Sequence, residues 1–507
     1  MLFDDLIHLI ASSSSIIIII IEAHNVALAM AKAGWAPVHH PSAIEQRVDV
    51  TQQVMGLTVS NPIGLAAGFD KDGDAIQPLL DLGFGLVEIG SVTPHPQPGN
   101  PSPRMFRLPQ DQGVINRYGL NSQGMEVVQQ HLKEFRRNQQ HQHQQQKSSR
   151  EATTMWEWIT FQLRSMTSRP PAIGIVGVNL GQNKHATDPL QDYATMMEHL
   201  GPDADYVVLN ISCPNQAGAA VLQQQQQNNN LDKLRQLLQT GIDARNQLVK
   251  RIPLLVKLSP DLTPETQDQL AHLLLSPECH NQIDGIILTN TSTSRPSWLQ
   301  SSPQVVNQQG GLSGRPINEL STATIRNMYA LTKGTIPIIG VGGIASGHDA
   351  YEKLKAGASL LQIYTGMVYH GPGVVSQIRH DLAQLMVDNG QRNLQDVIGI
   401  DHAELFWEKQ QQQRQQQQQQ QQQRLMASQQ EEKEERSASH QEDKEKQERW
   451  THQEEEEEKQ ETIIIEEDGI EREERMAQQQ QHQQQDHKEE KEESIMIVED
   501  KVERDER

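Results

Sequence analysis

Amide side chains that could bind a small ligand follow several short apolar runs between residues 61 and 367. Each asparagine amide offers both a donor and an acceptor of hydrogen bonds. Such a set suits a small planar ligand with alternating C=O and N–H groups, such as a pyrimidine ring, and Lys71 could bind a carboxylate on that ligand. One or two of these amides are expected only to cap turns. The asparagines are Asn116, Asn121, Asn179, Asn210, Asn215 and Asn290.

A thiol, Cys213, belongs to the same polar group and lies between Ser212 and Pro214. Cysteine is commonly a buried structural residue. Cys213 is flanked by polar residues rather than by an apolar run, and this favours a role as a general base or nucleophile. The second cysteine, Cys279, is expected to be a structural residue near the surface. Two cysteines indicate no disulfide framework.

Two glycine-containing segments follow the last two apolar runs. Gly342-Gly343 ends one run, and Tyr364-Thr365-Gly366 ends the other. Backbone N–H groups without neighbouring side chains can point at an anion, so these positions favour a phosphorylated ligand or cofactor. Gly314 could bring a further backbone donor.

The elements that position these residues repeat eight times as a short apolar run followed by a helical stretch. Continuous apolar runs of this length are typical of strands buried on both faces. The segments 231–250 and 317–333 have helical spacing. The sequence therefore predicts an α/β fold, a closed (β/α)8 TIM barrel, in preference to an open doubly wound sheet. The runs are 62–71, 84–93, 172–181, 204–215, 253–262, 283–292, 336–346 and 358–367.

Composition divides the chain into a barrel over 51–400 and a tail over 408–507. The tail is rich in Gln and Glu and carries 16 Lys and Arg against 31 Asp and Glu, so it holds −15 of the net charge of −22. Low hydrophobicity with high charge predicts disorder. The acidic balance gives no reason to expect nucleic acid. The Gln-rich inserts, 139–169 and 223–230, are predicted as disordered loops. Residues 1–50 hold an apolar segment and a short helix.

Several motifs, in order and at the expected strand ends, resemble the dihydroorotate dehydrogenase family. The resemblance covers about residues 22–399, apart from the inserts. The motifs are AAGFDK (66–71), EIGSVTPHPQPGNPSPRMFRLP (88–109), INRYGLNSQG (115–124), GVNLGQNK (177–184), NISCPN (210–215), KLSPDL (257–262), LTNTS (288–292), GGLSGRP (310–316), IIGVGGIASG (338–347) and QIYTG (362–366).

The resemblance implies FMN as the cofactor and dihydroorotate as the substrate, which is oxidised to orotate. It implies Cys213 as the catalytic base, and no metal is expected. Lys257 would stabilise the reduced flavin ring. The cofactor residues implied are Ala67, Gly68, Ser91, Asn179, Asn210, Lys257, Thr289, Gly314, Gly343, Tyr364 and Thr365. The substrate residues implied are Lys71, Asn116, Arg117, Tyr118, Gly119, Leu120, Asn121, Asn210, Asn215, Asn290 and Thr291.

The resemblance is to the membrane-associated members that reduce ubiquinone. The helix expected over 22–35 resembles their quinone-tunnel helix, with His24 and Arg107 as quinone contacts and the mitochondrial inner membrane as location. Cys213 departs from this type, which usually has Ser there, and Leu120 replaces a usual Phe. A cytosolic-type enzyme that uses fumarate or NAD, which Cys213 favours, and a Schiff-base lyase that uses Lys257 remain alternatives.

Overall fold

The structure is a computed structural model that describes residues 26–150, 174–211 and 227–402, and part of the tail between 415 and 480. Side chains at 142–150 and 227–230 are not described. The predictions for His24, Cys213 and Asn215 therefore fall outside the described residues. The chain divides into two compact units, Met1–Lys409 and Gln410–Arg507.

Eight parallel strands form a closed barrel in the first unit, which confirms the predicted fold. Each of the eight apolar runs contributes one strand. Most strand residues are buried, because helices cover the outer face and side chains fill the interior. In order around the barrel the strands are β10 (Gly285–Leu288), β12 (Ile338–Val341), β13 (Leu360–Ile363), β3 (Ile63–Leu65), β4 (Leu86–Val92), β7 (Ile175–Leu180), β8 (Tyr206–Asn210) and β9 (Leu254–Leu258).

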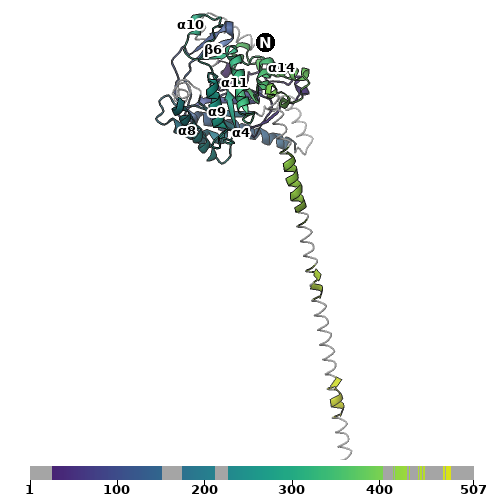
Figure 1. Ribbon diagram of the computed structural model, residues 1–507. Coiled ribbons are helices and arrows are strands. Elements are labelled where there is room, and N and C mark those ends of the chain that lie inside the picture. Colours follow the sequence, from purple (N-terminus) through teal and green to yellow (C-terminus); the bar gives the residue numbers. More distant parts are fainter. Residues whose placement is uncertain are drawn as a thin grey trace, which may run out of the picture. The chain divides into compact units, whose positions relative to one another are not determined.

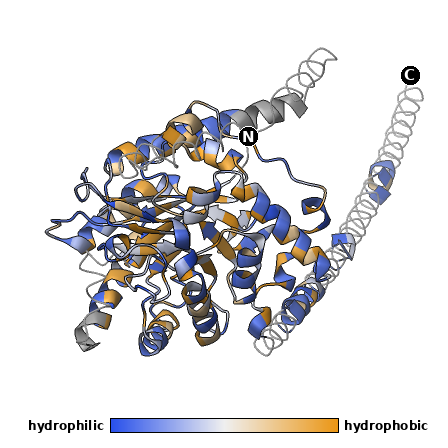
Figure 2. Ribbon diagram, turned by 90° about the horizontal axis from the view of Figure 1, so that it is seen from above, coloured by the Kyte–Doolittle hydropathy of each residue, from blue (hydrophilic) through white to orange (hydrophobic). Residues whose placement is uncertain are grey.

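Helices surround these strands (Figure 1). Figure 2 shows hydrophobic residues concentrated on the strands at the middle of the unit. Several helices start where the sequence supplies a cap: Asp188 accepts hydrogen bonds from two backbone N–H groups at the start of α6, and Thr263 caps α9. The helices are α3 (Ile76–Asp81), α4 (Met125–Arg150), α6 (Pro189–Leu200), α8 (Gln227–Asn246), α9 (Pro264–Leu274), α10 (Pro303–Val306), α11 (Asn318–Leu331), α12 (Gly347–Lys355), α13 (Thr365–His370) and α14 (Val374–Asp388).

Three sequence predictions are wrong. Residues 139–150 continue α4, and residues 227–230 begin α8, although both were predicted as loops. Glutamine has a high helix propensity, so these runs extend helices that apolar residues start or continue. Cys279 is 2% exposed rather than at the surface, because it packs in the core between the barrel and its helices.

Two small sheets complete the barrel. Two separate stretches of the chain form an antiparallel sheet in the order β11 (Gly311–Gly314), β6 (Gly113–Asn116) and β5 (Met105–Leu108). A hairpin of β1 (Gln52–Val54) and β2 (Leu57–Val59) packs Val54, Met55, Leu57 and Val59 against the side chains inside the barrel. The hairpin therefore helps to close the barrel interior.

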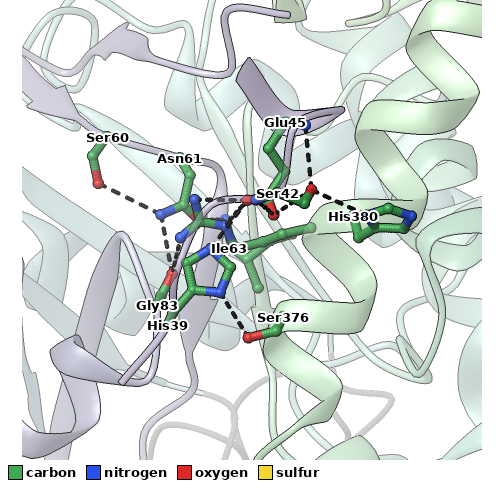
Figure 3. A network of polar contacts seen from close by, with 10 residues as sticks. His39, Ser42, Glu45, Ser60, Asn61, Ile63, Gly83, Ser376 and His380 are labelled. Atoms are coloured by element: carbon green, nitrogen blue, oxygen red, sulfur yellow. Dashed lines mark hydrogen bonds and ion pairs between the residues drawn. The ribbon is translucent and has the colours of Figure 1, made fainter. Parts of the chain in front are cut away.

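A polar network joins the chain before the barrel to α14 (Figure 3). Nδ1 of His39 lies 2.7 Å from Oγ of Ser376, and the Glu45 carboxylate accepts a hydrogen bond from Nε of Arg379 at 3.1 Å. Burial raises the pKa of Glu45, but the Ser42 backbone N–H and the Arg379 charge outweigh it and leave this pKa below its ordinary value. We interpret this network as structural.

Residues 417–430 of the second unit are helical and exposed, and Figure 2 shows most of the described tail residues as hydrophilic. Glutamine favours this helix, which buries no apolar side chain. Disorder of the tail stays a prediction. None of the described helices is long and apolar enough to span a membrane.

Candidate active site

A cavity lies at the carboxyl ends of the barrel strands, where the sequence predicted the site. The sheet of β5, β6 and β11 contributes Met105, Val114 and Ser313 to its wall, none of which the sequence predicted as site residues. The predicted residues that line the cavity are Ala67, Gly68, Lys71, Ser91, Asn116, Arg117, Tyr118, Gly119, Leu120, Asn210, Lys257, Thr289, Asn290, Thr291, Gly314, Gly343, Tyr364 and Thr365.

Four side chains, here called the amide chain, connect strand ends through successive hydrogen bonds. Nδ2 of Asn290 donates to Oδ1 of Asn210 at 3.4 Å, and Nδ2 of Asn210 donates to Oγ of Ser91 at 2.9 Å. The Ser91 hydroxyl in turn donates to Oδ1 of Asn179. Asn179 does not line the cavity and acts on it through Ser91. Three of the six asparagines that the sequence grouped together, Asn179, Asn210 and Asn290, are thus mutually oriented.

The amide chain ends on Glu88, a residue of β4 that the sequence did not single out. Its carboxylate is 0% exposed and accepts hydrogen bonds from Nδ2 of Asn179 at 2.9 Å and Nε2 of Gln362 at 2.6 Å. The Tyr206 hydroxyl lies 3.3 Å from its second oxygen. Burial and the Glu88 charge raise the pKa of Tyr206, so this hydroxyl keeps its proton and donates it. A charged residue inside an apolar run was the available signal.

Lys257 on β9 places an ammonium group at the cavity. Its Nζ lies 3.5 Å from Oε1 of Glu88, and the side chain is buried. A buried ammonium needs a counter-charge, which Glu88 supplies. The pair leaves Lys257 with further N–H groups for a ligand in the cavity.

Glycines give another part of the cavity wall a backbone without side chains. Gly314 has φ of +88°, and a Cβ there would lie 2.4 Å from the carbonyl oxygen of Gln112. Gly343 has φ of +73°, and a Cβ would lie 2.5 Å from Cβ of Asn318. Both positions therefore require glycine. The Thr365 hydroxyl lies nearby, 2.9 Å from Oγ of Ser313. This wall can hold a phosphate through backbone N–H and hydroxyl groups.

Lys71 provides a second cation at the cavity. Its Nζ lies 4.8 Å from the centre of the Tyr118 ring, and Arg104 lies 4.8 Å from the same ring. Desolvation lowers the pKa of Lys71 to about 8; Asp72 opposes this change and Arg104 adds to it. An anionic group of a ligand would therefore be favourable beside Lys71.

The loop after β6 is held in place by its neighbours. Asn100 donates from Nδ2 to the carbonyl oxygen of Arg117 at 2.9 Å and from its backbone N–H to that of Tyr118 at 2.8 Å. The Leu120 carbonyl accepts from Nε2 of Gln97 at 2.7 Å. Leu120 lines the cavity and has a φ of +55°. The hydrogen bonds of Asn100 and Gln97 hold the backbone of the loop in this conformation.

Four buried side-chain oxygens have no hydrogen-bond partner among the described residues, and two of them belong to site residues or their loop. One is Oδ1 of Asn121, which lies in this loop, and the other is Oε1 of Gln362, a cavity-lining residue. Buried acceptors without partners are costly, so a ligand N–H group is a suitable partner for Oε1 of Gln362, whereas Asn121 is not among the described residues that line the cavity.

Arg107 is not among the described residues that line the cavity. Its guanidinium lies 4.6 Å from the centre of the Tyr369 ring, and its buried Nε has no partner among the described residues. Alternation along β5 places Arg107 on the same face as Met105, which does line the cavity. In the described part of the chain no cluster of His, Cys, Asp or Glu could hold a metal ion.

The chain is similar to known proteins over most of the barrel. The family described as Dihydroorotate dehydrogenase matches residues 49–386. Dihydroorotate dehydrogenase (quinone), mitochondrial, of Mus musculus is 43% identical over 383 residues, which are 75% of this chain and 86% of that protein. Dihydroorotate dehydrogenase (quinone) of Azorhizobium caulinodans is 40% identical over 386 residues, 75% and 95% of the two chains.

A solved structure shares the fold. Ligand-free DHODH from Eimeria tenella superposes with a TM-score of 0.62 at 35% identity, covering 75% of this chain and 98% of that one. The family match extends over the barrel strands and the strand-end residues described above. The chain therefore belongs to the dihydroorotate dehydrogenase family.

Proposed function

We propose that this protein oxidises dihydroorotate to orotate, a step of pyrimidine synthesis, with FMN bound in the cavity and ubiquinone as the final electron acceptor. The observation that carries the proposal is one cavity at the carboxyl ends of a (β/α)8 barrel. It is lined by Lys257, which pairs with Glu88, by Ser91, Asn210 and Asn290 of the amide chain, and by Gly314 and Gly343. The curated relatives named above carry quinone in their names, which favours quinone over fumarate or NAD.

The described residues fit FMN. Gly314, Gly343 and Thr365 would hold its phosphate through backbone and hydroxyl groups. Lys257 and the unpartnered Oε1 of Gln362 offer donors and an acceptor to the ring system. A bound flavin supplies the hydride acceptor, while the protein supplies orientation and electrostatics. Ala67, Gly68, Ser91, Asn179, Asn210, Thr289 and Tyr364 complete the proposed cofactor residues.

Most of the proposed substrate residues line the same cavity. Lys71 would bind the substrate carboxylate, and the unpartnered Oδ1 of Asn121 would accept a ring N–H. The loop over 116–120, with Asn210, Asn290 and Thr291, would complete the pocket. Asn215 and Cys213 are proposed by resemblance, with Cys213 taking the proton from C5 of dihydroorotate while hydride leaves C6. A thiol has a pKa of about 8.5, close enough to neutral for this task.

Quinone access is proposed from the side of β5. Arg107 shares a face with Met105, so a quinone beside Arg107 would approach the cavity wall. Val26, Trp35 and Val38 expose apolar surface before the barrel, which supports contact of this segment and of His24 with a membrane surface. The relatives named as mitochondrial support the mitochondrion as location, and its inner membrane is proposed from the family resemblance alone. No nucleic acid partner is proposed.

The test is purification of the full chain with its native cofactor. The protein should be yellow, and acid precipitation should release FMN into the supernatant. Dihydroorotate and a ubiquinone analogue should then give orotate, and deletion of residues 1–35 should abolish quinone reduction while dihydroorotate still reduces the flavin. A colourless protein, or turnover only with fumarate or NAD, would contradict the proposal.

A further inference from the structure

Glu88 is a carboxylate inside the barrel to which the proposed function gives no role. We propose that Glu88 is a positioning residue: as an obligate acceptor for Asn179, it fixes the donor and acceptor direction of the amide chain that faces the pyrimidine ligand. This inference rests on the proposed function and deepens it.

The charge state of Glu88 follows from its contacts. An isolated carboxylate in a protein interior is very costly, and it is tolerated when charge and hydrogen bonds compensate it. Glu88 is 0% exposed, and its two oxygens have four donors, one each from Asn179, Lys257, Gln362 and Tyr206. These donors come from β7, β9, β13 and β8. Four donors, one of them a cation, favour the ionised form.

An ionised carboxylate has no proton to donate, and this sets the direction of the amide chain. Asn179 must present its NH2 group to Glu88, as the 2.9 Å contact of Nδ2 shows. Oδ1 of Asn179 is then the acceptor for the Ser91 hydroxyl. Ser91 has one proton, so its oxygen must accept from Asn210, whose Oδ1 is left to accept from Asn290. The carboxylate of Glu88 thus determines the orientation of three cavity-lining side chains, Ser91, Asn210 and Asn290.

If Glu88 is replaced by a residue that cannot accept a hydrogen bond, the donor and acceptor direction of the amide chain is no longer fixed. With an apolar side chain at 88, the Asn179 amide can turn over, and Ser91, Asn210 and Asn290 can follow. A ligand would then meet donors where it needs acceptors. An unsatisfied or misdirected buried hydrogen bond costs about 1–3 kcal/mol, which is about ten- to a hundredfold in affinity.

A glutamine at 88 would keep the acceptor and lose the charge. Its oxygen would face Asn179 and Lys257, both donors, so its NH2 group would face Gln362 and Tyr206. A turn of the Gln362 amide would let its Oε1 accept this NH2 group. Nε2 of Gln362 would then face the flavin in place of the acceptor proposed above, so FMN affinity is measured separately in this variant. The two variants therefore separate the acceptor from the charge and from packing.

The experiment compares Glu88→Met and Glu88→Gln in the full-length, FMN-loaded protein. Orotate affinity is measured from the change in flavin absorption on titration, FMN affinity from flavin fluorescence, and folding from the thermal midpoint. Glu126→Met and Glu126→Gln, at the exposed start of α4, are the matched controls and should change none of these values.

We expect orotate to bind Glu88→Met about ten- to a hundredfold more weakly. Glu88→Gln should restore the affinity to within about threefold of the natural protein. Wild-type affinity in Glu88→Met would overturn the proposal in favour of packing, and equal losses in both variants would overturn it in favour of the charge. If Glu88→Met does not fold, Glu88→Gln decides: a loss of about tenfold or more overturns the proposal. A natural protein that binds neither FMN nor orotate would instead refute the proposed function, and this inference with it.

Discussion

Lys71 should make orotate binding depend on pH. Desolvation, which Arg104 reinforces, lowers the pKa of Lys71 to about 8 in the ligand-free protein. The protonated ammonium attracts the substrate carboxylate, and the neutral amine does not. At pH 7 about nine-tenths of Lys71 is protonated, and at pH 9 about one-tenth. Affinity is therefore full below pH 7 and falls as pH rises through 8, by about tenfold between pH 7 and 9.

The assay is titration of the flavin-loaded protein with orotate at pH 6.5 to 9.5, followed by flavin absorption. Lys71→Arg stays charged over this range and should bind with an affinity that varies little with pH. Lys71→Met should bind weakly at every pH. The Cys213 thiol could titrate in the same range, and Lys71→Arg separates the two groups. A flat profile in the natural protein, or an unchanged slope in Lys71→Arg, would refute the reasoning.

Three further predictions concern the base, the cofactor wall and the tail. Cys213→Ala should bind FMN but lose about two to four orders of magnitude in the rate of flavin reduction, measured by stopped flow. Cys213→Ser should be active, with its pH–rate profile moved to higher pH. A near-normal rate in Cys213→Ala would exclude the thiol as the base. Gly314→Ala should weaken FMN binding, measured by fluorescence, because its Cβ would lie 2.4 Å from the Gln112 carbonyl and its φ of +88° costs about 1–3 kcal/mol; unchanged affinity would contradict this. Truncation after Lys409 should retain activity, while truncation before Asp401 should lower the thermal midpoint, because Arg326 pairs with Asp401 at 2.7 Å. Equal thermal midpoints of the two truncated proteins would contradict a stabilising role of the Arg326–Asp401 pair.

The barrel was predictable because each of its strands is buried on both faces and therefore reads as a continuous apolar run. Most cavity residues were predictable because the end of each apolar run gives the carboxyl end of a strand, and the site of this fold lies at those ends. The sheet of β5, β6 and β11 was not, because it pairs Gly311 with Asn116, about two hundred residues apart in sequence. Short strands with non-local partners leave little local signal.

The contacts of Glu88 could not be predicted from the sequence either. In a strand buried on both faces the sequence does not tell which side chains point into the barrel. Glu88, Tyr206 and Gln362 therefore could not be brought together before their strands were placed side by side. The Gln-rich composition of residues 139–150 and 227–230 indicates loops, whereas the helix propensity of glutamine favours the observed extensions of α4 and α8.

We propose that dihydroorotate is oxidised in this cavity and that the electrons then pass to quinone. Anaerobic mixing of the purified protein with dihydroorotate tests the first half, and addition of a ubiquinone analogue, fumarate or NAD to the reduced protein tests the second. We predict that dihydroorotate bleaches the flavin with formation of orotate, and that quinone restores the colour faster than fumarate or NAD. A flavin that stays oxidised with dihydroorotate, or one that quinone does not reoxidise, would contradict the account.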